Sequence, residues 1–249
     1  MVAGRARAAR VVQISDTHLS AGLGAPPGWA EFVACLHADP PDLVVHSGDI
    51  VLENPDDVAD RAFARKLIGQ LPGPVVVIPG NHDVGGYGPE DARLRARRVK
   101  VFVEAWGADR FALDLGGWRV VGANAYLLGD EEHDAWLAAA CAGDRPVAVF
   151  VHQPLWGDPD DGWAMPAGAA TAFEHALAGA DVRLVATGHR HCAAMADRGE
   201  RRSVWAPSLR LLGDVASAGT ELRDVDPRPG IVEHTLCVDS SHQFTVHRW

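Results

Sequence analysis

The chain has 249 residues, of which 47% are hydrophobic and 22% are charged, and its formal net charge is -10. This length and composition are ordinary for a soluble globular protein with a full apolar core. The acidic balance argues against a long nucleic acid as the partner, because like charges repel.

The four cysteines are far apart in the sequence and lack the short spacing of a zinc ribbon or a thiol redox motif. A reduced, cytoplasmic chain is therefore expected. The apolar run at residues 11–14 is too short for the core of a signal peptide, and no segment approaches the length of a membrane span. We expect no membrane partner.

Strands and helices alternate in the first 106 residues. Short β-branched runs are each followed by a longer segment rich in Ala, Leu and Arg. This pattern is typical of βαβ units around a buried, largely parallel sheet. The predicted elements are strands at 11–14, 43–46 and 75–78 and helices at 29–37, 56–71 and 89–106.

The second half begins with a hairpin, predicted from the glycine pair at residues 116–117. It then returns to alternation and ends in strands and turns. The predicted strands are 110–115, 118–124, 147–151, 182–186, 193–197, 203–206, 231–238 and 244–249, with helices at 131–141 and 171–177. No repeat or low-complexity linker divides the chain. We predict a single domain over residues 1–249 and an α/β fold, a four-layer αββα sandwich with two mixed β-sheets flanked by helices.

Five of the predicted strands end next to polar residues that can bind a metal ion or transfer a proton. Sites in open α/β sheets collect at the carboxyl ends of strands, so these distant positions are expected to converge. Carboxylate, imidazole and amide oxygen donors without a thiolate suit Mn, Fe or Zn. The residues are Asp16 and His18; Gly48 and Asp49; Gly80, Asn81, His82 and Asp83; His152; and Gly188, His189 and His191.

Each of these elements has an ordinary structural explanation when taken alone. Gly48 and Asp49 could form a plain turn, His152 could be a core histidine, and His189 with His191 could be a surface pair. The ordered combination of all five, each at a strand end, favours one shared metal site.

The five elements together resemble the signature of the calcineurin-like metallophosphoesterases. That signature reads Asp-x-His, Gly-Asp, Gly-Asn-His followed by Asp or Glu, a single His, and Gly-His-x-His, and each part has its counterpart among the residues above. The resemblance runs from about residue 10 to residue 192. The opening Ile-Ser-Asp-Thr-His-Leu at residues 14–19 is most similar to the class III cyclic-nucleotide phosphodiesterase branch.

The resemblance implies a site for two divalent or trivalent metal ions, Mn, Fe or Zn, bridged by Asp49. It assigns Asp16, His18, Asp49 and His191 to the first ion and Asp49, Asn81, His152 and His189 to the second. His82 would face the substrate phosphate together with Asn81. Asp83 is placed to orient the His82 imidazole, which makes His82 and Asp83 the candidate catalytic pair.

Two cations about 4 Å apart can share a bridging hydroxide at neutral pH and offset the charge that builds on a reacting phosphate. The expected reaction is therefore hydrolysis of a small phosphodiester such as a cyclic nucleotide or a glycerophosphodiester. A phosphomonoesterase, a non-catalytic scaffold and a nuclease are the alternatives, and the acidic charge argues against the last. The expected partner is a small phosphate ester, and a homodimer is left open.

Two loops are candidates for substrate binding. The loop at 155–168 contains Trp156 and Trp163, and the loop at 83–88 contains Tyr87. Aromatic side chains in such loops can stack on a substrate, although the tryptophans could equally pack their loop against the core. His46 lies inside a predicted strand and is interpreted as a core residue or a support for the ligands.

Overall fold

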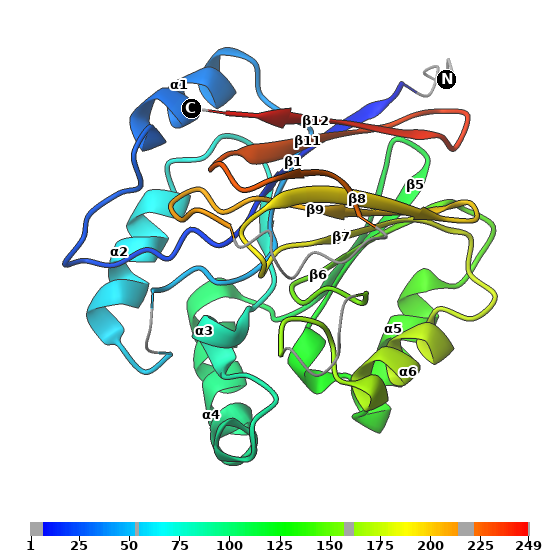
Figure 1. Cartoon of the computed structure of the whole chain (residues 1–249), viewed down its shortest axis with the longest axis horizontal. Coiled ribbons are helices and arrows are strands. Elements are labelled where there is room, and N and C mark those ends of the chain that lie inside the picture. The colour runs from blue at the N-terminus through cyan, green and yellow to red at the C-terminus, as the bar shows by residue number, and fades with distance from the viewer. Residues whose placement is uncertain (1–6, 53–54, 157–161, 214–221, 249) are drawn as a thin grey trace, which may run out of the picture.

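The computed structural model describes residues 7–52, 55–156, 162–213 and 222–248. Two β-sheets pack face to face, and helices cover their outer sides (Figure 1). The predicted four-layer αββα arrangement is thereby confirmed. The described helices are α1 (Trp29–Ala38), α2 (Val58–Ile68), α3 (Asn81–Val84), α4 (Pro89–Trp106), α5 (Glu131–Cys141) and α6 (Ala167–Ala176), with a 3-10 turn at Ala125–Leu127.

Both sheets are mixed. The five-stranded sheet has the order β12-β11-β1-β2-β3, and the seven-stranded sheet has the order β10-β8-β9-β7-β6-β5-β4. The strands of the first are β1 (Ala9–Ile14), β2 (Leu43–His46), β3 (Val75–Val77), β11 (Ile231–Leu236) and β12 (His242–His247). The strands of the second are β4 (Phe111–Leu115), β5 (Trp118–Ala123), β6 (Val147–Val151), β7 (Val182–Thr187), β8 (Ala193–Arg198), β9 (Arg201–Trp205) and β10 (Arg223–Asp226).

Alternation along the strands builds two cores. Val11 and Val45 face the second sheet and pack with Val120 and Phe150. Their neighbours on the opposite face of the first sheet join an apolar cluster with the helices, in which Val12 and Val44 pack with Phe32 of α1. Because every central strand is buried on both faces, its sequence is continuously apolar, as expected for strands covered by helices.

The parallel pairs place the functional loops at the same edge. Within the first sheet β1 and β2 are parallel, with Ile14 opposite His46. In the second sheet β6 and β7 are parallel, with Phe150 opposite Ala186. The chain leaving each of these four strands therefore emerges at the carboxyl edge of its sheet, which is where α/β proteins build their sites.

Each predicted element is present, with ends shifted by a few residues. One strand, one short α-helix and the 3-10 turn at Ala125–Leu127 were missed. The sequence of β10, Arg-Asp-Val-Asp, has no apolar alternation, and the strand forms through its pairing with β8. The short helix α3 begins at Asn81, inside the polar segment that reads as a turn. Residue 249, at the end of the last predicted strand, lies outside the described residues.

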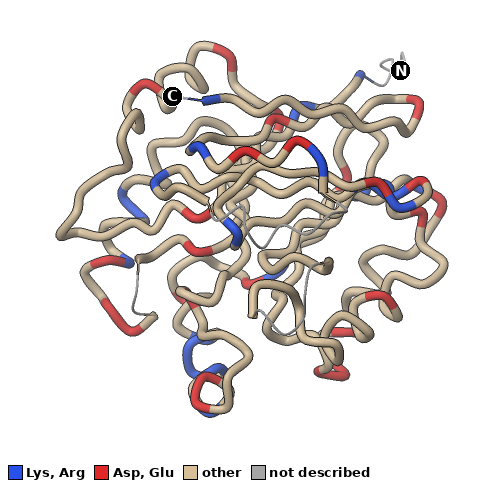
Figure 2. The backbone as a smooth tube through the Cα atoms, viewed as in Figure 1, with Lys and Arg blue, Asp and Glu red and all other residues tan. Residues whose placement is uncertain are grey.

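Charged residues of both signs are mixed over the backbone (Figure 2). The basic run at 93–100 lies on α4, where Arg95 donates to the Gly86 carbonyl oxygen and Arg98 pairs with Asp91. Within the described part of the chain, no helix combines the length and the apolar character that crossing a membrane would require.

Candidate metal centre

The loops that follow four parallel strands meet between the two sheets. The amide N–H of Asp16 donates to the Gly48 carbonyl oxygen at 2.9 Å, and that of Gly188 donates to the His152 carbonyl oxygen at 2.9 Å. The two sheets are joined where the His189 amide donates to the Asp16 carboxylate at 3.0 and 3.1 Å. Residues separated by more than 170 positions in the sequence thus share one buried site.

The first cluster consists of Asp16, His18, Asp49 and His191, whose potential ligand atoms all lie within 4.8 Å of one another. The Nε2 atoms of His18 and His191 are only 3.0 Å apart. His191 Nε2 lies 3.4 Å from Asp16 Oδ1, and His18 Nε2 lies 3.9 Å from Asp49 Oδ2. Two imidazole nitrogens and two carboxylates converge, as at a metal site with borderline-hard donors.

The second cluster consists of Asp49, His152 and His189, and it shares Asp49 with the first. His152 Nε2 lies 3.3 Å from Asp49 Oδ2 and makes no hydrogen bond, although the ring is completely buried. Its Nδ1 lies 2.8 Å from the Ser47 carbonyl oxygen, which can only accept, so Nδ1 carries the proton. The lone pair of Nε2 is thereby directed into the cluster, the arrangement of a histidine metal ligand.

Left-handed backbone conformations concentrate on the predicted ligands. Asp16, His18, Asp49, His189 and His191 all have positive φ angles, between 43° and 68°. Outside glycine, only Asp224 and Ser240 share this conformation among the described residues. Asp and His tolerate the left-handed region better than most residues, but each instance still costs free energy and requires support from its surroundings.

Two of the predicted glycines are required by close approach. A Cβ atom on Gly80 would lie 2.0 Å from Asp49 Oδ1, and one on Gly188 would lie 1.9 Å from Ser15 Oγ and 2.5 Å from Asp16 Oδ2. A side chain at Gly80 would therefore displace the Asp49 carboxylate, and one at Gly188 would displace Ser15 and Asp16.

His46 supports the ligand loops without entering the clusters. Its Nδ1 accepts the Gly48 amide proton at 3.3 Å, so Nε2 is protonated and donates to Thr17 Oγ1 at 2.8 Å. Thr17 in turn donates to the Ile50 carbonyl oxygen at 3.3 Å. Burial lowers the pKa of His46 to about 3, so the ring is neutral. The sequence interpretation of His46 as a support for the ligands agrees with these contacts.

The electrostatics of the clusters favour positive charge. Burial alone would raise the pKa of Asp49, but the positive charges of His152 and His18 lower it well below its usual range. Burial likewise opposes protonation of His152, yet the negative charge of Asp49 raises the pKa of that imidazole to about 9. A buried pocket that draws a proton onto an imidazole beside two carboxylates provides the negative field that a bound cation requires.

These residues fit a metal centre. The shared carboxylate, the unpartnered Nε2 of His152 and the facing Nε2 atoms of His18 and His191 supply donors to two adjacent positions. Asp49 belongs to both clusters, and its role as a bridging ligand stays a prediction. The donor set alone does not distinguish Mn, Fe and Zn.

Asn81 and His82 lie at the start of α3. The amide oxygen of Asn81 faces the hydroxyl of Tyr126 at 3.4 Å. The His82 ring is one-third exposed, packs edge-on against His18 at 4.7 Å, and places its Nε2 4.0 Å from Asp49 Oδ2. His82 is therefore a partly open imidazole beside the clusters, where the sequence predicts a group that faces substrate.

Asp83 does not orient His82, which corrects the sequence prediction. Its buried carboxylate accepts the amide protons of Gly80 at 2.9 Å and of Ile50 and Val51 at 3.2 Å. The Nδ1 of His82 has no hydrogen-bond partner within the described residues. Because α3 begins at residue 81, the carboxylate turns back to cap the helix, and Asp83 clamps the Asp49 loop to α3.

The predicted substrate-binding aromatics divide into two groups. Trp163 packs against His189 with ring centroids 5.1 Å apart, and Tyr87 packs against Tyr126 at 5.1 Å. Trp156 instead lies against Arg198, whose guanidinium carbon is 4.4 Å from the centroid of the Trp156 ring. Residues 157–161 of the predicted 155–168 loop lie outside the described residues.

A pocket of about 270 Å³ adjoins the second cluster. The described residues that line it are Asn81, Gly86, Tyr87, Gly88, Gln153, Gly162, Ala164, Pro166 and His189. Gln153 was not among the predicted site residues, because a glutamine next to a candidate ligand histidine indicates no function by itself.

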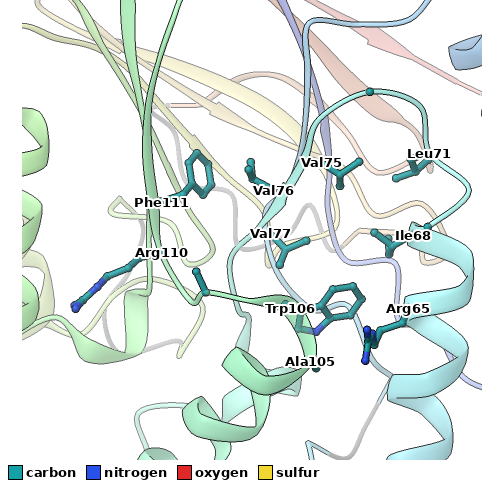
Figure 3. A pocket seen from close by; sticks show the side chains of 13 residues that line it. Arg65, Ile68, Leu71, Val75, Val76, Val77, Ala105, Trp106, Arg110 and Phe111 are labelled. Atoms are coloured by element: carbon teal, nitrogen blue, oxygen red, sulfur yellow. The ribbon is translucent and has the colours of Figure 1, made fainter.

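A second pocket, of about 470 Å³, lies away from this chemistry (Figure 3). It is lined by residues of α2, β3, the end of α4 and the start of β4, where Val76 and Phe111 face each other across the gap. Among the described residues that line it, none carries a carboxylate, an imidazole or a thiol. The metal centre is therefore identified by its converging donors rather than by the size of a cavity.

Comparison with known proteins agrees with this geometry. A family model described as calcineurin-like phosphoesterase matches residues 9–193, which contain all seven predicted ligands. The chain belongs to this calcineurin-like phosphoesterase family. The family resemblance predicted from the five strand-end elements is confirmed.

Two curated members of the family show how far sequence similarity extends. The chain is 32% identical over 165 residues to glycerophosphodiester phosphodiesterase GpdQ of Enterobacter lignolyticus, covering 58% of this chain and 56% of that protein. It is 30% identical over 135 residues to serine/threonine-protein phosphatase CPPED1 of Bos taurus, covering 47% and 41%. The matches span about half of each relative.

Solved structures show the same fold at low sequence identity. A dimetal phosphatase from Danio rerio aligns with a TM-score of 0.65 at 13% identity, covering 96% of both chains. GAP50, described as the anchor in the inner membrane complex of Plasmodium, aligns with a TM-score of 0.67 at 11% identity, covering 96% of this chain and 84% of that one. The same fold is therefore found in a protein described as a phosphatase and in one described as an anchor. The fold alone does not assign an activity, which must be argued from the site.

Proposed function

We propose that this calcineurin-like phosphoesterase hydrolyses a small phosphodiester with the help of two metal ions. The observation that supports the proposal most directly is the pair of donor clusters that share the buried Asp49. Asp16, His18 and His191 would complete the first position, and Asn81, His152 and His189 would complete the second. Two Mn, Fe or Zn ions would supply Lewis acidity toward the phosphate and toward the attacking water.

The chain's own groups provide the rest of the chemistry. The ionised carboxylates of Asp16 and Asp49 hold the ligand histidines in place across the clusters. His82, whose ring is one-third exposed, lies within reach of a phosphate at the cluster and would stabilise its charge or protonate the leaving oxygen. Asp83 fixes the loop that carries Asp49.

A diester is favoured over a monoester by the space beside the second cluster. The pocket of about 270 Å³ is lined in part by Asn81 and His189 and has room for a second ester group. Similarity to a glycerophosphodiester phosphodiesterase points the same way, and a probable cyclic nucleotide phosphodiesterase from Moraxella catarrhalis is 32% identical over 77 residues, covering 30% of this chain and 27% of that protein.

A phosphomonoesterase is the second candidate, because the relative from Bos taurus is described as a protein phosphatase. Rates on bis(4-nitrophenyl) phosphate and on 4-nitrophenyl phosphate, each with Mn, Fe and Zn, separate the two. We expect faster turnover of the diester. A clear preference for the monoester would contradict the diester assignment.

Two ligand variants test the metal centre itself. Asn81→Ala and His152→Ala should each remove most of the metal-dependent turnover, while His175→Ala on α6, outside both clusters, should leave it unchanged. Full activity in both ligand variants would contradict the proposal. Failure of the purified protein to take up any transition metal would instead favour a non-catalytic scaffold.

A further inference from the structure

The described residues that line the pocket beside the second cluster are uncharged. None of these nine residues is Lys, Arg, Asp or Glu. A group that enters it from a phosphate at the cluster is therefore neutral, since a buried charge without a partner is strongly disfavoured. The volume of about 270 Å³ suits a group of a few carbon atoms.

Most polar groups of the pocket walls are already hydrogen-bonded within the protein. The Tyr87 hydroxyl donates to the Ala125 carbonyl oxygen at 2.7 Å, and the Gly86 amide donates to Asp91 at 3.0 Å. The carbonyl oxygens of Gly86 and Pro166 accept from Arg95 and from the Ala170 amide. These groups contribute shape and apolar surface rather than recognition.

Gln153 differs from these groups because only the NH₂ end of its side-chain amide is hydrogen-bonded within the described residues. Its Nε2 donates to the carbonyl oxygens of Gly162 at 3.2 Å and Ala164 at 2.9 Å. Both partners are acceptors, so the NH₂ end of the amide must face them and the orientation of the side chain is fixed. The remaining polar atom, Oε1, makes no hydrogen bond in the described part of the chain and is not sealed from solvent.

An oxygen held in this way can only accept a hydrogen bond, so it selects a ligand group that donates one. The neutral donor that a small ester group carries is a hydroxyl. We propose that Gln153 determines specificity by accepting a hydrogen bond from a hydroxyl on one ester group, so that diesters of small polyhydroxylated alcohols are preferred. This inference rests on the proposed phosphodiesterase function.

A nucleobase fits the same pocket poorly. Its ring nitrogens and carbonyl oxygens need donors, whereas both N–H groups of Gln153 and the Tyr87 hydroxyl already bind carbonyl oxygens of the protein. Burying acceptors without donors costs free energy. The proposed specificity therefore separates small polyol esters from nucleotide esters.

The test compares two chromogenic diesters, 4-nitrophenyl 2,3-dihydroxypropyl phosphate and 4-nitrophenyl propyl phosphate, which differ only in the hydroxyl groups. The wild-type protein should show a kcat/KM for the dihydroxypropyl ester that is about tenfold higher, the effect of one neutral hydrogen bond. In Gln153→Met the ratio should fall to about one. Gln243→Met, the same change on the exposed strand β12, should leave the ratio as in the wild type.

The ratio separates recognition from a structural role. If Gln153 only held the 162–164 segment in place, its replacement would slow both substrates equally and the ratio would persist, which would overturn the inference. The wild-type ratio alone provides the test if Gln153→Met does not fold: equal rates on both diesters would overturn the inference and leave the phosphodiesterase function intact. Hydrolysis of neither diester would contradict the phosphodiesterase function itself.

Discussion

The Nε2 atom of His152 lies 3.3 Å from Oδ2 of Asp49, and both side chains are buried at the junction of the two sheets. His152 follows β6 of the seven-stranded sheet, whereas Asp49 follows β2 of the five-stranded sheet. This contact joins the halves of the fold at the residue that both donor clusters share. The consequences of that arrangement can be measured.

Asp49→Asn should disturb both metal positions at once. The amide keeps the size of the carboxylate but removes the negative charge that both clusters share. We expect the metal content to fall below that of His152→Ala, which removes a ligand from one position only, and activity to fall by at least about a hundredfold. Metal analysis after dialysis gives the readout. Equal metal content in the two variants would contradict a bridging role.

Tyr126→Phe should weaken metal binding at the second position by about tenfold. The Tyr126 hydroxyl faces the amide oxygen of Asn81 at 3.4 Å, and without it the amide is free to rotate. Tyr87→Phe is the matched control, because that hydroxyl binds the Ala125 carbonyl oxygen instead. Calorimetric titration with Mn²⁺ distinguishes them. The same affinity in both variants would show that Tyr126 does not position Asn81.

Asp83→Ala should lower the free energy of unfolding by about 3 kcal/mol, because three buried amide donors lose their acceptor. Asp91→Ala removes a half-exposed carboxylate and should cost less than about 1 kcal/mol. Urea unfolding of the metal-free proteins provides the comparison. A similar loss of unfolding free energy in both variants would show that the hydrogen bonds of Asp83 stabilise the fold no more than those of Asp91.

Stability should fall as the pH falls from about 6.5 toward 4, because buried histidines, among them His234 and His242, remain neutral in the folded protein. Burial lowers the pKa of His234 well below its usual value, and burial together with the Arg202 charge lowers that of His242 to about 4. Below pH 6.5 these imidazoles become protonated in the unfolded chain but stay neutral in the folded protein. Each histidine therefore removes about 1.4 kcal/mol of stability per pH unit within this window, and none above it.

The variant His234→Gln removes one of the imidazoles that bind a proton in the unfolded chain but not in the folded protein. Its stability should depend less steeply on pH between about 6.5 and 4, by about 1.4 kcal/mol per unit, in urea unfolding at several pH values. His175→Gln on α6 serves as the control. An unchanged slope in His234→Gln would show that the unfolded chain does not gain a proton at this position.

Most of the strands, the order of the ligand motifs and the family were predictable from the sequence. Continuous β-branched runs specify strands buried on both faces, and polar residues directly after them have no packing role there. Asp16, His18, Asp49, His152, His189 and His191 were therefore predictable, because parallel strands bring their carboxyl ends to one edge whatever the details of packing.

The groups that support these ligands became apparent only in the folded structure. The Ser47 carbonyl oxygen that orients His152 and the Tyr126 hydroxyl at Asn81 join residues far apart in the chain, and the Gln153 amide binds across its own loop to the 162–164 segment. Such pairings depend on loop paths and on backbone carbonyl groups, which every residue possesses and which leave no pattern in a sequence. Asp83 shows the same limit: its position beside His82 suggested a partner, but the helix that begins at residue 81 turns its carboxylate toward the Asp49 loop.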